Sequence, residues 1–197
     1  MVKMSNGDIR FKEQIGIVTS EASSEQFKFF VTPLTNNLGV GKDDYIIIEY
    51  NLYGKPCPLL AVVKDLINYE EVIGTSIREN KSVKTIATGE IIGCVDIRNP
   101  EVKILRKIST PPTPGCRVFL PYLEFLEDVF SRTQTGKLLK RPLHIGELLN
   151  ANSKQGGLKP LNFYLDFENL TNNHMLISAI SGHGKTSLAS VIVEEIV

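Results

Sequence analysis

Near the end of the chain stands a glycine-rich stretch, Ala179-Ile180-Ser181-Gly182-His183-Gly184-Lys185-Thr186. It follows the apolar run Met175-Leu176-Ile177 and precedes a helix-like run from Leu188 to Val197. A phosphate-binding loop occupies this place, between a buried strand and the N-terminus of a helix. The stretch therefore predicts the first strand, loop and helix of a nucleotide-binding α/β domain.

The residue types in this loop suit a polyphosphate. Backbone N–H groups and a helix dipole converge on phosphate oxygens, and small residues let the main chain approach. We expect Lys185 to reach the β- and γ-phosphates as the catalytic residue, and the Thr186 hydroxyl to help to hold Mg²⁺. The predicted ligands are ATP and Mg²⁺, and the predicted binding residues are Ser181, Gly182, His183, Gly184, Lys185, Thr186 and Ser187.

Ala179 stands where the strict loop pattern has its first glycine. Alanine is small enough for that position if its φ is negative. The alternative is a glycine-rich turn that binds no ligand. A domain of this kind also needs further strands, an acidic motif and an arginine, and none follows Val197. We therefore expect the N-terminal part of a longer ATPase, with little or no ATP turnover by these residues alone.

Composition limits the class of protein. The 197 residues are 42% hydrophobic, which allows one domain and part of a second. The 22 basic and 22 acidic residues balance, so the chain does not coat nucleic acid by bulk charge. It has neither a run of about 20 apolar residues nor a signal-peptide core. We expect a cytoplasmic protein without a membrane segment.

Cysteines and histidines give no metal-site pattern. Cys57, Cys94 and Cys116 are odd in number, widely spaced and form no C-x-x-C. This spacing argues against a disulfide framework or a zinc site, so we interpret them as small buried apolar residues. The three histidines are equally scattered.

The first two-thirds of the chain is rich in β-forming residues between turns, which is typical of a barrel or sandwich. Phe27, Phe29 and Val31 alternate, and so do Ile15 and Ile17, which predicts that each set shares one face. The fold class is therefore mainly β, with a small N-terminal β-barrel. The candidate strands are Gln14–Ser20, Gln26–Thr32, Tyr45–Tyr50 and Leu59–Leu66.

Two segments stay open. Val83–Ile97 is β-rich but interrupted by Gly89 and Gly93, and it fits two strands or one bent strand. Ile67–Asn80 is polar with a sparse apolar pattern, and it fits a helix or a solvated crossover.

A proline-rich connector, Thr110–Gly115, separates the β-rich part from the rest of the chain. A short strand, Val118–Leu120, and a helix that begins at Pro121 come next, and a further strand is expected at Leu161–Phe167. The basic cluster Arg132–Arg141 fits a solvated loop better than a DNA contact. Asn150–Lys159 has the composition of a loop.

Five features in this order resemble the HerA family of archaeal and bacterial ATPases, of the HerA/FtsK group. They are Ile15-Gly16-Ile17-Val18, the passage into Gly115-Cys116-Arg117-Val118, the element Leu143-His144-Ile145-Gly146-Glu147-Leu148, the strand end Leu165-Asp166, and His174-Met175-Leu176-Ile177 before the loop. The resemblance covers nearly the whole chain. HerA loops commonly have serine where His183 stands, and we expect this change to have a modest effect because the loop binds through its backbone N–H.

The resemblance implies two domains, a HAS-type β-barrel in residues 1–110, and a connector with the incomplete start of a RecA-like P-loop ATPase domain in residues 111–197. It further implies a homohexameric DNA translocase or helicase that acts on double-stranded DNA. Its partner would be a NurA-type nuclease in DNA end resection and double-strand break repair. The barrel would dock the nuclease and hold the ring together.

Two alternatives remain at this point. A rotary-type ATPase subunit also places a small β-barrel before a phosphate loop, and DNA-stimulated hydrolysis would separate the two. The other alternative is a non-catalytic barrel whose phosphate loop is vestigial, which a measurement of ATP binding would identify.

Overall fold

A computed structural model gives the fold and describes residues 13–32, 40–73, 80–95, 105–133, 136–148, 161–173, 175–178, 180 and 182–196. The elements are β1 (Glu13–Ala22), β2 (Gln26–Val31), β3 (Tyr45–Ile48), β4 (Asn51–Leu52), β5 (Lys55–Pro56), β6 (Leu59–Ile73), β7 (Asn80–Val95), β8 (Leu105–Arg106), β9 (Arg117–Leu120), α1 (Leu123–Phe130), β10 (Pro142–Leu148), β11 (Leu161–Asp166), α2 (Phe167–Asn172) and α3 (Lys185–Ile196). The predicted loop Asn150–Lys159 lies outside the described residues.

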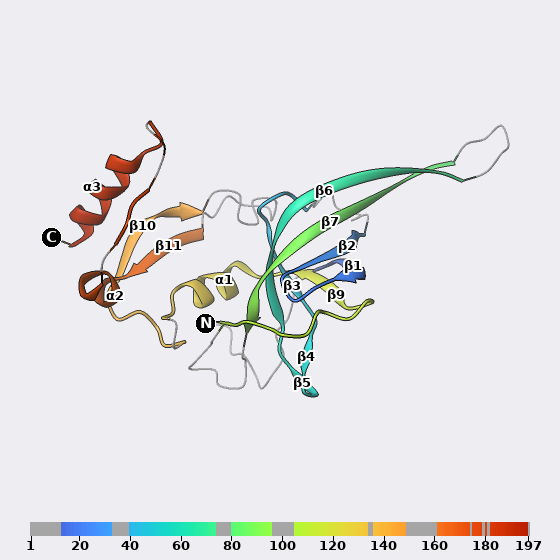
Figure 1. The fold of residues 1–197 in the computed structure, drawn as a ribbon, viewed down its shortest axis with the longest axis horizontal. Coiled ribbons are helices and arrows are strands. Elements are labelled where there is room, and N and C mark those ends of the chain that lie inside the picture. Colours follow the sequence, from blue (N-terminus) through green and yellow to red (C-terminus); the bar gives the residue numbers. More distant parts are fainter. Residues whose placement is uncertain are drawn as a thin grey trace.

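A large antiparallel sheet dominates the chain, which confirms the prediction of a mainly β fold (Figure 1). Its strand order among the described residues is β2-β1-β9-β3-β6-β7-β8. β2 also pairs with β7, from Gln26 opposite Glu90 to Val31 opposite Thr85. The pairings therefore lead from β2 through the sheet to β7 and back to β2.

The strands predicted from alternation are present. β1, β2, β3 and β6 overlap the four candidates, although β6 continues past Leu66 to Ile73, and β7 is one continuous strand rather than two. The open segment Ile67–Asn80 contains the far ends of β6 and β7, which pair as far as Ile73 opposite Asn80. These ends reach beyond the body of the sheet as a two-stranded arm (Figure 1). A two-stranded arm has little core to face, so its sequence lacks the alternation of a half-buried strand.

The main core is formed by side chains on one face of the sheet. Phe27 and Phe29 are 1% and 0% exposed, as their alternation predicts, and their ring centroids are 5.8 Å apart. The same prediction is wrong for β1, where Ile15 is buried but Ile17 is 42% exposed. The pairing of β1 with β9 shifts register between Gln14 and Gly16. A bulge of this kind moves the following side chains to the other face, and Val18 is buried in place of Ile17.

Cys57 and Cys94 are both buried and are joined by a disulfide between residues whose Cα atoms are 5.8 Å apart. The interpretation of all three cysteines as unpaired apolar residues is therefore wrong for these two. The two cysteines are 37 residues apart in the sequence, so their spacing gave no sign of the pair. The pairing of β6 with β7 brings them together, because it places Leu59, two residues after Cys57, opposite Cys94. Cys116 is a free thiol, and its partial burial raises its pKa.

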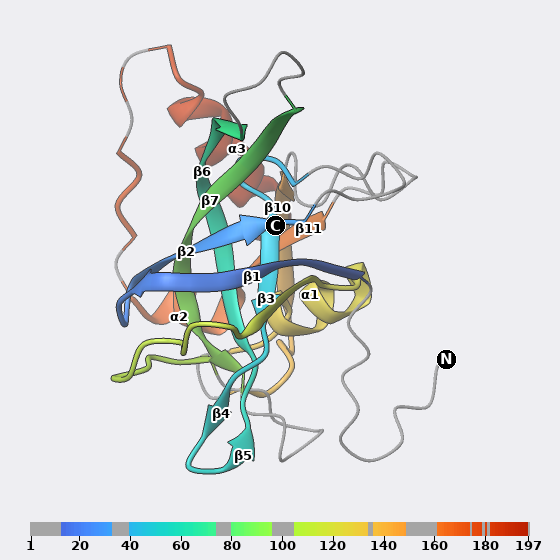
Figure 2. The same cartoon turned by 90° about the vertical axis from the view of Figure 1, so that its right-hand side faces the viewer.

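A short hairpin, β4–β5, projects from the sheet on the side away from α3 (Figures 1 and 2). Its two turn residues, Tyr53 and Gly54, have φ values of 52° and 73°. Two positive φ values in a two-residue loop define a type I′ turn, for which Asn-Gly is the preferred sequence. A bulky residue in this region costs on the order of 1–3 kcal/mol. Tyr53 is therefore a strained residue.

A second core joins the sheet to the later elements of the chain. It contains Ile47 and Leu60 from the sheet, Leu126 from α1 and Leu161 from β11. The predicted helix after Pro121 is α1, which buries Phe125, Leu126 and Val129 on one face. Figure 2 shows α1 beside the sheet and the β10–β11 hairpin. α1 thus lies between the first part of the chain and the last.

The sheet continues past residue 110, where the predicted boundary between domains lies. β9 pairs with both β1 and β3 and is thus an internal strand. The connector also contacts the sheet, because the backbone N–H of Gly115 donates to the carbonyl of Val18 at 2.9 Å. The division into two domains stays a prediction. None of the described helices is long and apolar enough to cross a membrane.

Candidate nucleotide site

The predicted phosphate loop leads directly into α3. Gly182 and Gly184 have φ values of 82° and 73°, which favour glycine. The backbone N–H of His183 donates to the carbonyl of Ile180 at 3.2 Å, and that of Leu188 donates to the carbonyl of Gly184 at 2.9 Å. Gly184 therefore accepts the first hydrogen bond of α3, and Lys185 is its first residue. The helix predicted after the loop is confirmed.

The loop is open to solvent along its described length. Gly182, His183, Gly184, Lys185, Thr186 and Ser187 are all exposed. No atom lies within 4 Å of the position that a Cβ would take on Gly182 or Gly184. The N-terminus of a helix, an exposed lysine and an exposed threonine hydroxyl match the groups that bind a nucleotide phosphate and Mg²⁺. The described residues therefore fit the predicted ligands. Ser181 lies outside them.

The strand predicted before the loop is not present. Residues 175–178 belong to no helix or strand, and Leu176 and Ile180 are 90% and 77% exposed. No described strand lies beside this segment to pair with it. The apolar faces of α3 are similarly open, with Val193 59% exposed, while Ile192 is buried as α3 packs against β10. A buried strand requires neighbours, and apolar composition alone does not supply them.

A strand pair, β10–β11, carries the chain to the loop. The expected strand Leu161–Phe167 is confirmed as β11, which pairs with β10 from Pro142 opposite Asp166 to Leu148 opposite Leu161. Asp166 ends the strand and caps α2, because its carboxylate accepts from the N–H of Glu168 at 3.2 Å. In β10 the register shifts between His144 and Gly146. The resemblance element Leu143–Leu148 is thus a bulged strand.

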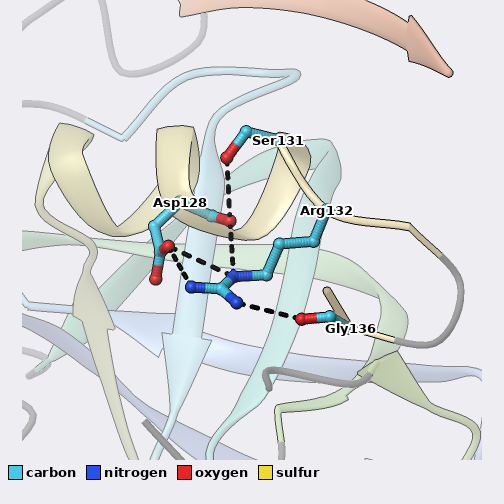
Figure 3. A network of polar contacts seen from close by, with 4 residues as sticks. All are labelled: Asp128, Ser131, Arg132 and Gly136. Atoms are coloured by element: carbon cyan, nitrogen blue, oxygen red, sulfur yellow. Dashed lines mark hydrogen bonds and ion pairs between the residues drawn. The ribbon is translucent and has the colours of Figure 1, made fainter. Parts of the chain in front are cut away.

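The two arginines of the basic cluster Arg132–Arg141 are held by contacts within the protein, while Lys137 and Lys140 are exposed. Figure 3 shows the Arg132 guanidinium between the Asp128 carboxylate, 3.1 Å from Nε, and the Gly136 carbonyl, 2.9 Å from Nη1. The side chain of Arg132 is only 6% exposed. The Arg141 guanidinium lies 4.1 Å from the centroid of the Phe167 ring. These contacts favour a structural role over DNA binding.

Sequence reasoning missed two of these relationships. The ion pair of Arg132 with Asp128 has the i,i+4 spacing that joins side chains on a helix, and this spacing was the available signal. Gly54 and Pro56 predict a turn at this place, but the positive φ of Tyr53 had no signal, because Tyr-Gly is an unusual sequence for a type I′ turn. Among the described residues, no group of three His, Cys, Asp or Glu side chains is placed to hold a metal ion.

The comparison with protein families agrees with the resemblance. Residues 143–197 match the family model described as Helicase HerA, central domain. The matched range runs from β10 through the phosphate loop to the end of α3. No curated protein is significantly similar to the chain. The match favours a HerA-type ATPase over a rotary-type subunit, and the segment that carries the loop is similar to the central domain of HerA helicases.

Proposed function

We propose that this chain is the N-terminal part of an ATP-dependent DNA translocase or helicase of the HerA type. The observation that carries the proposal is the loop in which Gly182 and Gly184 adopt positive φ immediately before Lys185 at the N-terminus of α3. This loop lies within the range that matches the HerA family model.

The chain's own residues would act on the triphosphate in three ways. The N–H groups from Gly184 to Ser187 would hold the phosphate oxygens, because they lie at the N-terminus of α3, where the helix dipole favours an anion. Lys185 would neutralise the β- and γ-phosphates, and Thr186 would orient Mg²⁺. ATP supplies the free energy for movement along DNA when its γ-phosphate bond is hydrolysed.

The proposal extends to the remaining predictions on domains and partners. Residues 1–110 would form most of a HAS-type barrel, and residues 111–197 the connector and the start of a RecA-like domain. Support for a closed barrel comes from the pairing of β2 with β7. The parent would be a cytoplasmic hexameric ring on double-stranded DNA that works with a NurA-type nuclease in end resection and double-strand break repair.

Docking of the nuclease would use an apolar row on the outer face of the sheet. Ile17 is opposite Phe30, Phe30 is opposite Ile86, and Ile86 is opposite Ile67, so four strands contribute to one line. Ile17, Phe30 and Ile67 are 42%, 47% and 46% exposed. A contiguous apolar row of this kind is typical of a protein-binding surface. Phe30→Asp would remove nuclease capture, while Thr19→Asp, on the same face of β1, is the matched control.

Binding of a fluorescent ATP analogue with Mg²⁺ tests the central proposal. Lys185→Ala removes a charge-assisted contact and should weaken binding about tenfold or more. Lys137→Ala, at another exposed lysine, should leave binding unchanged. In the full-length protein, Lys185→Ala should abolish ATP hydrolysis and preserve the oligomer. Equal ATP affinity of wild type and Lys185→Ala would overturn the assignment of the site.

A further inference from the structure

The tip of the β4–β5 hairpin presents an aromatic ring that the fold does not use. Tyr53 is 92% exposed. Its φ of 52° places it in the left-handed region, where an aromatic residue is strained. Burial does not offset this strain, and asparagine would satisfy the same turn without it. Because no contact within the protein compensates for this strain, we infer that the ring binds another molecule.

The base of the hairpin holds the tip rigidly. The N–H of Cys57 donates to the carbonyl of Tyr50 at 2.8 Å, directly below the hairpin strands. Cys57 is fixed to Cys94 by the disulfide. The buried Tyr50 hydrogen-bonds through its hydroxyl to Thr110. A ring presented on a rigid support loses little conformational entropy when it binds.

The only charged side chain in the hairpin, residues 51–56, is that of Lys55. Lys55 is exposed and forms no ion pair with another described residue. Glu49, the acidic residue that precedes the hairpin, is bound by Arg117 at 2.7 Å from Nε. The tip therefore combines one exposed aromatic face with one exposed cation, and no residue from 51 to 56 is acidic.

We propose that Tyr53 and Lys55 form a binding point for single-stranded nucleic acid, in which the ring stacks on an unpaired base and the ammonium group contacts the adjacent phosphate. Stacking on aromatic side chains combined with positive charge is how proteins hold single strands without reading their sequence. A stable protein partner would need about 800 Å² of contact on each side, far more than a four-residue tip offers. The hairpin lies outside the range that matches the HerA family model and on the side away from α3.

Fluorescence anisotropy with a labelled oligo-dT strand, an oligo-U strand and a duplex of mixed sequence tests this proposal on the full chain. Tyr53→Asn should weaken single-strand binding by about fivefold or more. The same substitution should raise Tm by roughly 2–4 °C, because it relieves the strained turn. Higher stability with lower affinity cannot result from misfolding. Tyr53→Phe keeps the ring and should bind as wild type does.

Lys55→Gln should reduce the slope of log affinity against log salt by about 0.7. Equal affinity for the labelled single strand in the wild type and in Tyr53→Asn overturns the proposal. Tighter binding of the duplex than of either single strand, with the same sensitivity to Tyr53, also overturns it. ATP binding measured on Tyr53→Asn should be unchanged, so a failure here is distinct from a failure of the nucleotide site.

Discussion

The guanidinium of Arg117 donates two hydrogen bonds to the carboxylate of Glu49, 2.7 Å from Nε and 3.0 Å from Nη2. The backbones of the same residues are joined, since the N–H of Glu49 donates to the carbonyl of Arg117 at 2.9 Å. This pair ties the end of β3 to β9. The hydrogen bonds from Arg117 hold the pKa of Glu49 below its ordinary value of 4.5.

The Glu49–Arg117 pair predicts a dependence of stability on pH. Because the folded pKa of Glu49 is lower than the unfolded one, its contribution is complete above about pH 4.5 and is lost as pH falls through the folded value. Glu49→Gln should therefore lower Tm at pH 7, and the difference from wild type should shrink below pH 4. Glu147→Gln, at an exposed carboxylate, is the control. A constant difference across this range would contradict the prediction.

Arg132 should be essential for stability rather than for binding. Arg132→Ala removes the hydrogen bonds from the guanidinium to the Asp128 carboxylate and the Gly136 carbonyl, which should cost about 2–4 kcal/mol in urea unfolding. Lys140→Ala removes an exposed charge from the same cluster and should cost less than about 0.5 kcal/mol. If Arg132→Ala reduced the affinity for DNA and left the free energy of unfolding unchanged, Arg132 would be a DNA-binding residue instead.

Gly89 allows β7 to pass close to the Phe27 ring. A Cβ at this position would lie 2.5 Å from Cζ and 2.6 Å from Cε1 of Phe27. Gly89→Ala should therefore lower the free energy of unfolding by about 1–3 kcal/mol. Phe27→Leu should relieve part of this loss, so the two substitutions together should cost less than their sum in a double-mutant cycle. Strict additivity would contradict the contact.

The Cys57–Cys94 disulfide predicts sensitivity to reductant. It closes a segment of 37 residues that includes the whole β6–β7 arm. Loss of this crosslink should cost about 2–4 kcal/mol. Thermal unfolding with and without dithiothreitol measures the effect, and Cys57→Ser should unfold at the same lowered temperature with either buffer. Cys116→Ser should keep the response of the wild type to reductant, because Cys116 is free.

Gly184 should be required for nucleotide binding but not for the stability of the sheet. Its φ of 73° is unfavourable for alanine, although no atom obstructs a Cβ there. Gly184→Ala should therefore distort the loop and weaken ATP binding about tenfold, by roughly 1–2 kcal/mol of strain. The main unfolding transition should stay within about 0.5 kcal/mol of wild type. Unchanged ATP binding would indicate that the loop does not hold phosphate.

The sequence predicts those features that depend only on residues near one another in the chain. Phe27 and Phe29 alternate because one face of β2 is buried, and the glycines of the loop are required by their positive φ. Contacts between residues far apart in the sequence could not be predicted from it. The disulfide depends on the register of β6 with β7, and the exposure of Ile17 depends on a bulge against β9. The apolar run at 175–177 resembled a strand, but a strand also requires a partner.

Leu161 is fully buried in the core that holds Ile47, Leu60 and Leu126. β11 begins at this anchored side chain and ends at Asp166, on the path to Lys185. The β10–β11 hairpin is thus attached to the sheet through this core. A force applied to the sheet would therefore be transmitted along β11 to Asp166. Under the proposed function, force between the phosphate loop and the sheet would pass through the apolar side chains around α1.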